Sequence, residues 1–182
     1  MNTPGTDELP RRVGRGLVDA VHPVAHSQVT MTQLMGPQDA NLFGNVFGGV
    51  ILAAVDKIAY VCATRHAGES CVTASFDQVD FRSAIQIGEV VTLQAAVNTV
   101  GRTSIEVGVR VSAESVQGKN RRHTNSCYVT MVAIDNNGNP IPVPQLELRT
   151  EEEGRRYRDA EDRRAARLEL AEGRNRRRKA GN

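Results

Sequence analysis

The sequence has few cysteines and lacks any long apolar run, and both features limit the class of protein. Its three cysteines, Cys62, Cys71 and Cys127, lie far apart and form no C-x-x-C pair, so neither a disulfide framework nor a zinc site is expected. There is no uninterrupted stretch of about 18 apolar residues, and residues 1–25 lack an apolar run of signal-peptide length. We therefore expect reduced thiols and a soluble, cytoplasmic protein with no bound metal and no membrane contact.

Motifs for several common chemistries are also missing. The G-x-S-x-G sequence of serine hydrolases does not occur. The glycine pattern G-x-x-x-G-G at residues 44–49 lacks the Lys-Ser/Thr pair of a phosphate-binding loop. Of the four histidines, only His66 and His123 fall within the expected folded region, and His66 fits the end of a helix better than the role of a base.

Charge divides the chain of 182 residues into three expected parts. Residues 1–25 mix glycine, proline and scattered charges without a steady period, which predicts a flexible N-terminal arm. Residues 26–146 form one domain. Residues 147–182 form a charged tail, because the chain after Gln145 carries 12 of the 23 Lys and Arg residues and 9 of the 21 acidic residues. The tail has few large apolar residues, so it is expected to be a solvated helix and an accessory to the domain. A basic patch for nucleic acid at residues 174–179 is the less favoured alternative.

Hydrophobic periodicity predicts an α+β domain. Residues 47–66 are apolar on almost every side and too long for a strand, so they predict a buried helix. Alternating apolar residues predict strands over residues 27–35, 71–81, 89–100, 103–116 and 122–134. This order favours an antiparallel sheet wrapped around one long central helix.

Residues 36–57 contain the best candidates for chemistry. Gly48 and Gly49 open the predicted helix, where free backbone N–H groups and the helix dipole can stabilise an oxyanion. Asp56 follows among apolar neighbours, where burying an acid is costly unless a partner holds it. A purely structural acid is an equal alternative. Asn41 lies in a loop, where asparagine usually only stabilises a turn.

Four blocks of sequence, in order, resemble the cytosolic acyl-CoA hydrolase family of hotdog-fold thioesterases. They are DANLFGNVFGGVILAAVDKIA, VTASFDQVDFRSAIQIGEVV, VGRTSIEVGVRVSAE and VTMVAIDNNGNPIPVP. The resemblance covers about residues 27–145 and implies a hotdog fold. It also implies an acyl-CoA thioesterase of fatty acid metabolism that releases free CoA and a carboxylic acid.

The resemblance also implies a role for each candidate residue. Asp56 matches the catalytic acid and Asn41 its partner amide, while Gly48 and Gly49 match the thioester-binding helix start. The expected CoA-binding residues are Gly101, Arg102, Thr103, Ser104 and Arg82. Arg102 could equally be a solvated residue at the end of a strand. No cofactor is expected, because coenzyme A enters only as part of the substrate and product.

Three positions depart from the family pattern. Phe47 stands where many relatives have histidine, Val50 where some have tryptophan, and residues 82–84 replace a turn that contains proline. These departures leave the preferred acyl chain open. Asp56 is expected to act as general base on water or, as a second possibility, as a nucleophile that forms an anhydride.

Helix geometry predicts that the active site needs two subunits. Asp56 lies seven residues beyond Gly49, so the two stand on one helix face but about 10 Å apart along the axis. One helix cannot bring both to the same thioester, so we expect a homodimer at least. The resemblance implies a trimer of dimers, which is a hexamer. The alternative function is a non-catalytic acyl-CoA-binding regulator. A hotdog dehydratase is disfavoured because no histidine lies between His26 and His66.

Overall fold

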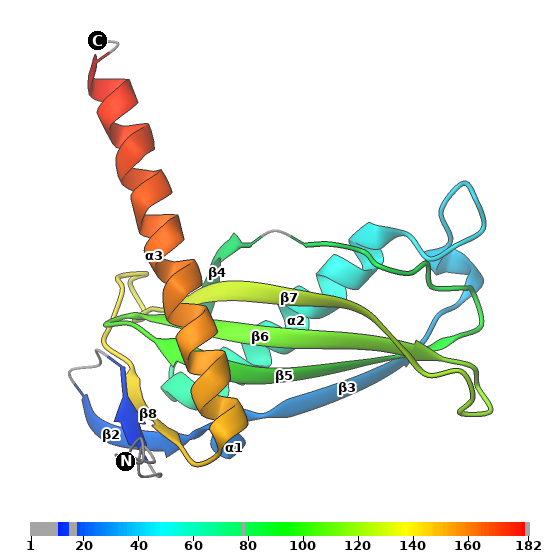
Figure 1. The fold of residues 1–182 in the computed structure, drawn as a ribbon, viewed down its shortest axis with the longest axis horizontal. Helices are drawn as coiled ribbons and strands as arrows, with labels where there is room; N and C mark the ends of the chain where they lie inside the picture. The colour runs from blue at the N-terminus through cyan, green and yellow to red at the C-terminus, as the bar shows by residue number, and fades with distance from the viewer. Residues whose placement is uncertain (1–10, 15–17, 78, 181–182) are drawn as a thin grey trace, which may run out of the picture.

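A five-stranded antiparallel sheet surrounds one long helix in the computed structural model, which describes residues 11–14, 18–77 and 79–180. In sheet order the strands are β3 (Val29–Leu34), β5 (Val90–Val100), β6 (Ser104–Glu114), β7 (Arg122–Ala133) and β4 (Cys71–Phe76). The helix α2 (Gly48–Ala67) lies along the concave face of this main sheet (Figure 1). The predicted α+β hotdog fold is confirmed.

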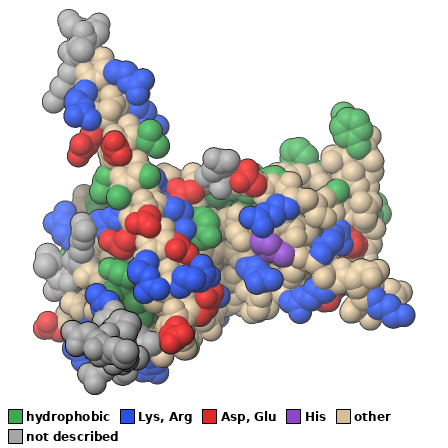
Figure 2. Space-filling model, viewed as in Figure 1, with side chains coloured by type: hydrophobic (Ala, Val, Ile, Leu, Met, Phe, Trp, Pro, Cys, Tyr) green, Lys and Arg blue, Asp and Glu red, His purple; other side chains and the backbone are tan. Residues whose placement is uncertain are grey.

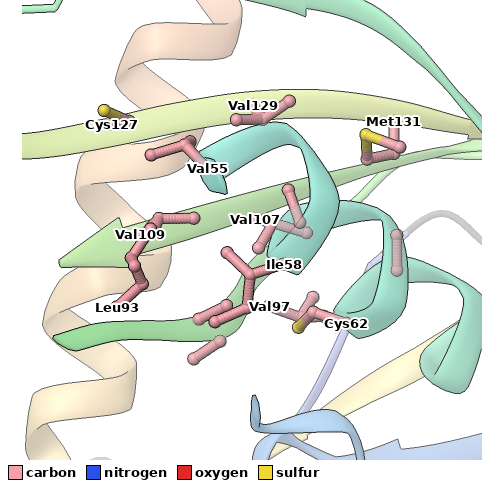
Figure 3. Close-up of a cluster of buried hydrophobic side chains, with 14 of the residues drawn as sticks. Val55, Ile58, Cys62, Leu93, Val97, Val107, Val109, Cys127, Val129 and Met131 are labelled. Atoms are coloured by element: carbon pink, nitrogen blue, oxygen red, sulfur yellow. The ribbon is translucent and has the colours of Figure 1, made fainter. Parts of the chain in front are cut away.

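Apolar side chains of α2 and of the sheet face one another and form the core. Figure 3 shows Val55, Ile58 and Cys62 of α2 opposite side chains of β5, β6 and β7. These side chains are at most 2% exposed, and each large aliphatic one contributes about 1.5–3 kcal/mol by leaving water. The helix ends at Gly68, whose φ of 71° suits glycine and whose N–H donates to the carbonyl of Thr64. The core therefore fixes which face of α2 meets the sheet.

A second, three-stranded sheet joins the first two strands of the described chain to the last one. It contains β1 (Arg11–Val13), β8 (Pro144–Leu148) and β2 (Val18–Pro23), with β8 in the middle. The strand β1 runs antiparallel to β8 and β2 runs parallel to it. The short helix α1 (Val24–Ser27) and the 3₁₀ turn η1 (Pro37–Asp39) complete the N-terminal region.

The flexible arm expected for residues 1–25 is therefore wrong for residues 11–13 and 18–25, while residues 1–10 and 15–17 lie outside the described part. The strands are too short to show a period, and their partner β8 lies more than a hundred residues away in sequence. The expected boundary at residue 146 also falls inside β8. Pairing with β8, rather than local pattern, orders this segment.

The charged tail is a helix, α3 (Glu151–Ala180), whose first half packs on the outer face of the main sheet (Figure 1). Ala160 is fully buried there. Glu106 of β6 is also covered, with its side chain only 2% exposed, and it accepts hydrogen bonds from Arg163 Nη2 at 2.6 Å and Arg167 Nη2 at 3.0 Å. The helical tail was predicted, but its description as solvated is wrong for this half, because arginines join Ala160 and Tyr157 in the contact with the sheet.

Two further contacts fix the same half of α3. The guanidinium of Arg163 stacks on the ring of Tyr128, 3.6 Å from its centroid. Arg167 also pairs with Asp77, which follows β4. The rest of α3 extends beyond the sheet, and Figure 2 shows acidic and basic side chains along it. Among the described residues, no helix has the length and apolar character needed to cross a membrane.

Candidate active site

The start of α2 presents backbone N–H groups that no side chain caps. The residue before the helix, Phe47, has extended backbone and makes no capping hydrogen bond with its side chain. An aromatic ring explains one of the two glycines, because a Cβ on Gly49 would lie 2.4 Å from a ring carbon of Phe47, whereas a Cβ on Gly48 would make only ordinary contact with Phe81 at 3.4 Å. The open helix start can stabilise negative charge on a carbonyl oxygen.

Asn41 lies in the loop that leads into this helix start. Its Oδ1 accepts hydrogen bonds from the N–H groups of Phe43 at 2.9 Å and Asn45 at 3.2 Å. The turn-stabilising role predicted as an alternative is therefore present. Because the oxygen is engaged by the turn, the side-chain NH₂ group is the part of Asn41 that can donate to a ligand. Leu42 and Phe43 form an exposed apolar loop tip, at 100% and 89% exposure.

Asp56 is half-buried on α2 and is held by a residue that the sequence analysis did not single out. Thr73 of β4 donates a hydrogen bond of 2.6 Å from its hydroxyl to Asp56 Oδ1. Strand alternation could have found Thr73, because it lies two residues after Cys71, which is buried under α2. The bond orients the carboxylate and leaves Oδ2 able to accept a proton from water.

Gly101, Arg102, Thr103 and Ser104 form the tight connection between β5 and β6. The N–H of Gly101 donates to the carbonyl of Ser104 at 2.7 Å, and the side chain of Arg102 is exposed. Ile105, which follows this block, pairs with Met131, and Met131 pairs with Thr73. The block thus lies about two strand spacings, roughly 10 Å, from the Asp56 and Thr73 pair.

Arg82 lies near the other end of the main sheet. Its N–H donates to the carbonyl of Thr124, whose hydroxyl donates to the carbonyl of Val111. Val111 is seven residues along β6 from Ser104, which is about 23 Å at the usual rise of about 3.3 Å per residue. The structure therefore does not bring all the expected CoA-binding residues together within one chain.

The site residues of one chain fall into two groups. The first group, at the start of α2, contains Asn41, Gly48, Gly49 and Arg82. The second contains Asp56, Thr73 and the connection at residues 101–104, and it begins two helical turns further along α2. A single subunit supplies the halves of a site rather than one closed site.

The buried thiols and the buried histidine are not poised for nucleophilic chemistry. Burial raises the pKa of Cys62 to about 12 and that of Cys71 to about 11. Burial lowers the pKa of His66 to about 4, and its Nε2 lies 3.2 Å from the carbonyl oxygen of Pro144. His66 lies in the last turn of α2, as predicted. Within the described ranges, no three His, Cys, Asp or Glu side chains form a group that could hold a metal ion.

This chain is similar to known thioesterases in sequence and in structure. The model of the thioesterase superfamily matches residues 43–118, which include the start of α2, Asp56 and Thr73. The protein VdlD of Helicobacter pylori is 44% identical over 134 residues, covering 74% of this chain and 76% of VdlD. The crystal structure of an apo-hexameric acyl-CoA thioesterase superposes with a TM-score of 0.80 at 43% identity, over 84% of this chain and 97% of that one.

The acyl-CoA hydrolase of Staphylococcus aureus is a third relative, with a TM-score of 0.76 and 32% identity over 84% of this chain and 96% of its own. Its structure was solved with butyryl coenzyme A, coenzyme A and coenzyme A disulfide. The present chain belongs to the acyl-CoA hydrolase family of hotdog-fold thioesterases, as its sequence blocks predicted.

Alanine variants of the S. aureus enzyme have also been crystallised. They replace an asparagine, an aspartate 15 residues later (43 − 28) and a threonine 17 residues after that (60 − 43). Asn41, Asp56 and Thr73 have the same residue types and the same spacings (56 − 41 and 73 − 56). The resemblance therefore includes the threonine that the sequence analysis did not single out.

Proposed function

We propose that the protein hydrolyses the thioester of acyl-CoA to free CoA and a carboxylic acid, in the cytoplasm and within fatty acid metabolism. The observation that carries this proposal is the hydrogen bond from Thr73 to Asp56, found in a chain that belongs to a family of acyl-CoA hydrolases. It holds a carboxylate in one orientation on the same helix whose open start can stabilise an oxyanion. A carboxylate and an oxyanion site suffice for an activated thioester.

In the proposed mechanism, Asp56 Oδ2 removes a proton from water while the water oxygen attacks the thioester carbonyl carbon. The NH₂ group of Asn41 and the N–H groups of Gly48 and Gly49 stabilise the oxyanion of the tetrahedral intermediate. Breakage of the carbon–sulfur bond releases the CoA sulfur, which takes the proton from Asp56. Direct attack by Asp56 to form an anhydride is the second possible route, and neither route uses a metal or redox cofactor.

The two groups of site residues support a homodimer in which each active site is shared. A two-fold axis would place the helix start and Asn41 of one subunit opposite Asp56 and Thr73 of the other. The same arrangement lets Arg82 of one subunit and residues 101–104 of another contact a single CoA. The hexameric relative supports further assembly into a trimer of dimers.

Thiol release from acyl-CoAs of short, medium, long and aromatic acyl groups tests the function. The wild-type protein should hydrolyse at least one class. Asp56→Asn should lower turnover by about two to four orders of magnitude with folding and CoA binding intact, the usual contribution of a positioned base. Lys57→Gln, a change at the exposed neighbouring residue, is the control. Buffer-level rates on all substrates, with CoA still bound, would instead favour the non-catalytic regulator.

Mixing two inactive variants tests the shared site. Asn41→Ala and Asp56→Asn subunits should form mixed dimers with one site carrying both defects and one carrying neither. Activity should then return toward half of the wild-type value per mixed dimer. If mass spectrometry confirms subunit exchange and no activity appears, each site lies within one subunit.

A further inference from the structure

A hollow of about 150 Å³ lies between α3 and the outer face of the main sheet. Thr99, Ser104 and Thr130 line it from the strands, and Arg164, Arg167 and Leu168 line it from α3. Thr130 precedes Met131, which contacts Thr73 on the α2 side of the sheet. Because neighbouring strand residues face opposite sides, the hollow lies on the face of the sheet opposite Asp56.

Two donors in this hollow are buried without a hydrogen-bond partner, namely Arg164 Nη1 and Thr130 Oγ1. Leaving a guanidinium nitrogen buried and unpaired is costly, so a hydrogen-bond acceptor that enters the hollow would bind favourably. The two neighbouring arginines of α3 differ, because Arg163 and Arg167 are both paired with Glu106. Arg164 therefore brings a charge into the hollow that those carboxylate contacts do not neutralise.

The remaining nearby carboxylate does not fill this role. Glu161, one turn before Arg164 on α3, accepts a hydrogen bond of 2.7 Å from the hydroxyl of Thr99. The oxygens of Glu106 receive hydrogen bonds from Arg163 Nη2 and Arg167 Nη2. Arg164 Nη1 makes no hydrogen bond to either carboxylate, and an external anion would be a suitable partner.

Gly101 provides the space in which the donors converge. A Cβ at this position would lie 2.5 Å from Ser104 Oγ and 3.1 Å from both terminal nitrogens of Arg164. The Ser104 hydroxyl and the planar fork of the Arg164 guanidinium therefore both lie close to Gly101. Phosphoryl oxygens match this arrangement, because a guanidinium binds them through two parallel hydrogen bonds while hydroxyls bind the remaining oxygens.

We propose that Arg164, Ser104 and Thr130 form a binding subsite for a phosphoryl group. The group belongs either to coenzyme A, in which case the inference rests on the proposed function, or to free phosphate that binds independently of the substrate. Arg164 lies in the tail, which the family blocks in the sequence do not cover. The subsite gives the docked half of α3 a role in binding a ligand.

Titration calorimetry with inorganic phosphate, CoA and dephospho-CoA tests the proposal on the full chain. Arg164→Gln should weaken binding of phosphate or of CoA by about 10-fold or more, as expected for loss of a charged hydrogen-bonding group. Arg164→Lys, which keeps the charge and loses the fork, should give an intermediate value. Arg158→Gln, at an exposed position on the same helix, is the control and should change nothing. Thermal melts of each variant check folding.

Kinetics separate the two sources of the phosphoryl group. If it belongs to CoA, Arg164→Gln should raise KM for acyl-CoA with little change in kcat, and the preference for CoA over dephospho-CoA should shrink if the 3′-phosphate is the bound group. If free phosphate is the ligand, its binding should be lost while KM stays constant. Equal binding of phosphate, CoA and dephospho-CoA by wild type and Arg164→Gln would overturn the inference. Phosphate binding is measured without turnover. It therefore tests the subsite even if the protein hydrolyses no acyl-CoA.

Discussion

Replacing Glu106 with glutamine should loosen α3 from the sheet. The substitution keeps the size of the side chain but removes the charge that faces Arg163 and Arg167. Removing one member of a fully buried ion pair costs about 3–5 kcal/mol. Both arginines are about one quarter exposed, at 23% and 25%, and Arg167 keeps Asp77 as a partner. We therefore expect a smaller loss of about 2–3 kcal/mol in the free energy of unfolding.

Calorimetry and amide hydrogen exchange measure this effect. At about 2–4 °C per kcal/mol for a chain of this size, Tm should fall by about 4–12 °C. Comparison must be made at one protein concentration, because assembly also shifts Tm. Amides of residues 155–168 should exchange faster, whereas Glu114→Gln at the end of the same strand should behave as wild type. A Tm within about 1 °C of wild type, with α3 still protected, would show that these ion pairs do not hold the helix.

Two other predictions concern the site and the helix end. Thr73→Val keeps the shape of the side chain but removes its hydrogen bond to Asp56, so kcat should fall about 10- to 100-fold with little change in KM or Tm. Thr30→Val is the control. Full activity of Thr73→Val, equal to that of the control, would contradict the positioning role. His66 has a pKa of about 4 in the fold against 6.5 normally, so the unfolded chain binds the proton first and stability falls as pH drops from 6.5 to 4. The free energy of unfolding, measured with urea, should change by an extra amount of about 1.4 kcal/mol per pH unit in this range, and His66→Gln should lack this extra change. Equal dependence of the free energy on pH in both proteins would exclude His66 as the cause.

Most of the main domain could be predicted from local pattern. The helix expected at residues 47–66 is observed at Gly48–Ala67, and all five expected strands are present. Alternating apolar residues indicate strands such as β6 and β7, and an apolar run too long for a strand indicates the buried helix. The strand expected at residues 71–81 ends at Phe76, after which the backbone contacts β7 through separate hydrogen bonds, from Asp77 to Tyr128 and from Arg82 to Thr124.

What the sequence did not reveal depends on residues distant in the chain. Strand alternation places Thr73 on the same side as Cys71, but its hydroxyl is matched to Asp56 only in the structure, because Asp56 lies 17 residues earlier on a different element. Glu106 sits in an apolar alternation, and only its contacts with Arg163 and Arg167 explain why an acid is buried there. The tail has few large apolar residues, so a docking surface made mainly of arginine and glutamate gave little hydrophobic signal.

The three-stranded sheet also sets an order of events during synthesis. Translation proceeds from the N-terminus, so β1 and β2 emerge roughly 120 residues before β8, the only strand they pair with among the described residues. At about 5–20 residues per second, these two strands wait about 6–24 s for a partner on the ribosome. Every strand of the main sheet is made within that interval. The corner where the first two strands meet the last strand must therefore form late, and amide protection in β1 and β2 should appear after that in β5, β6 and β7.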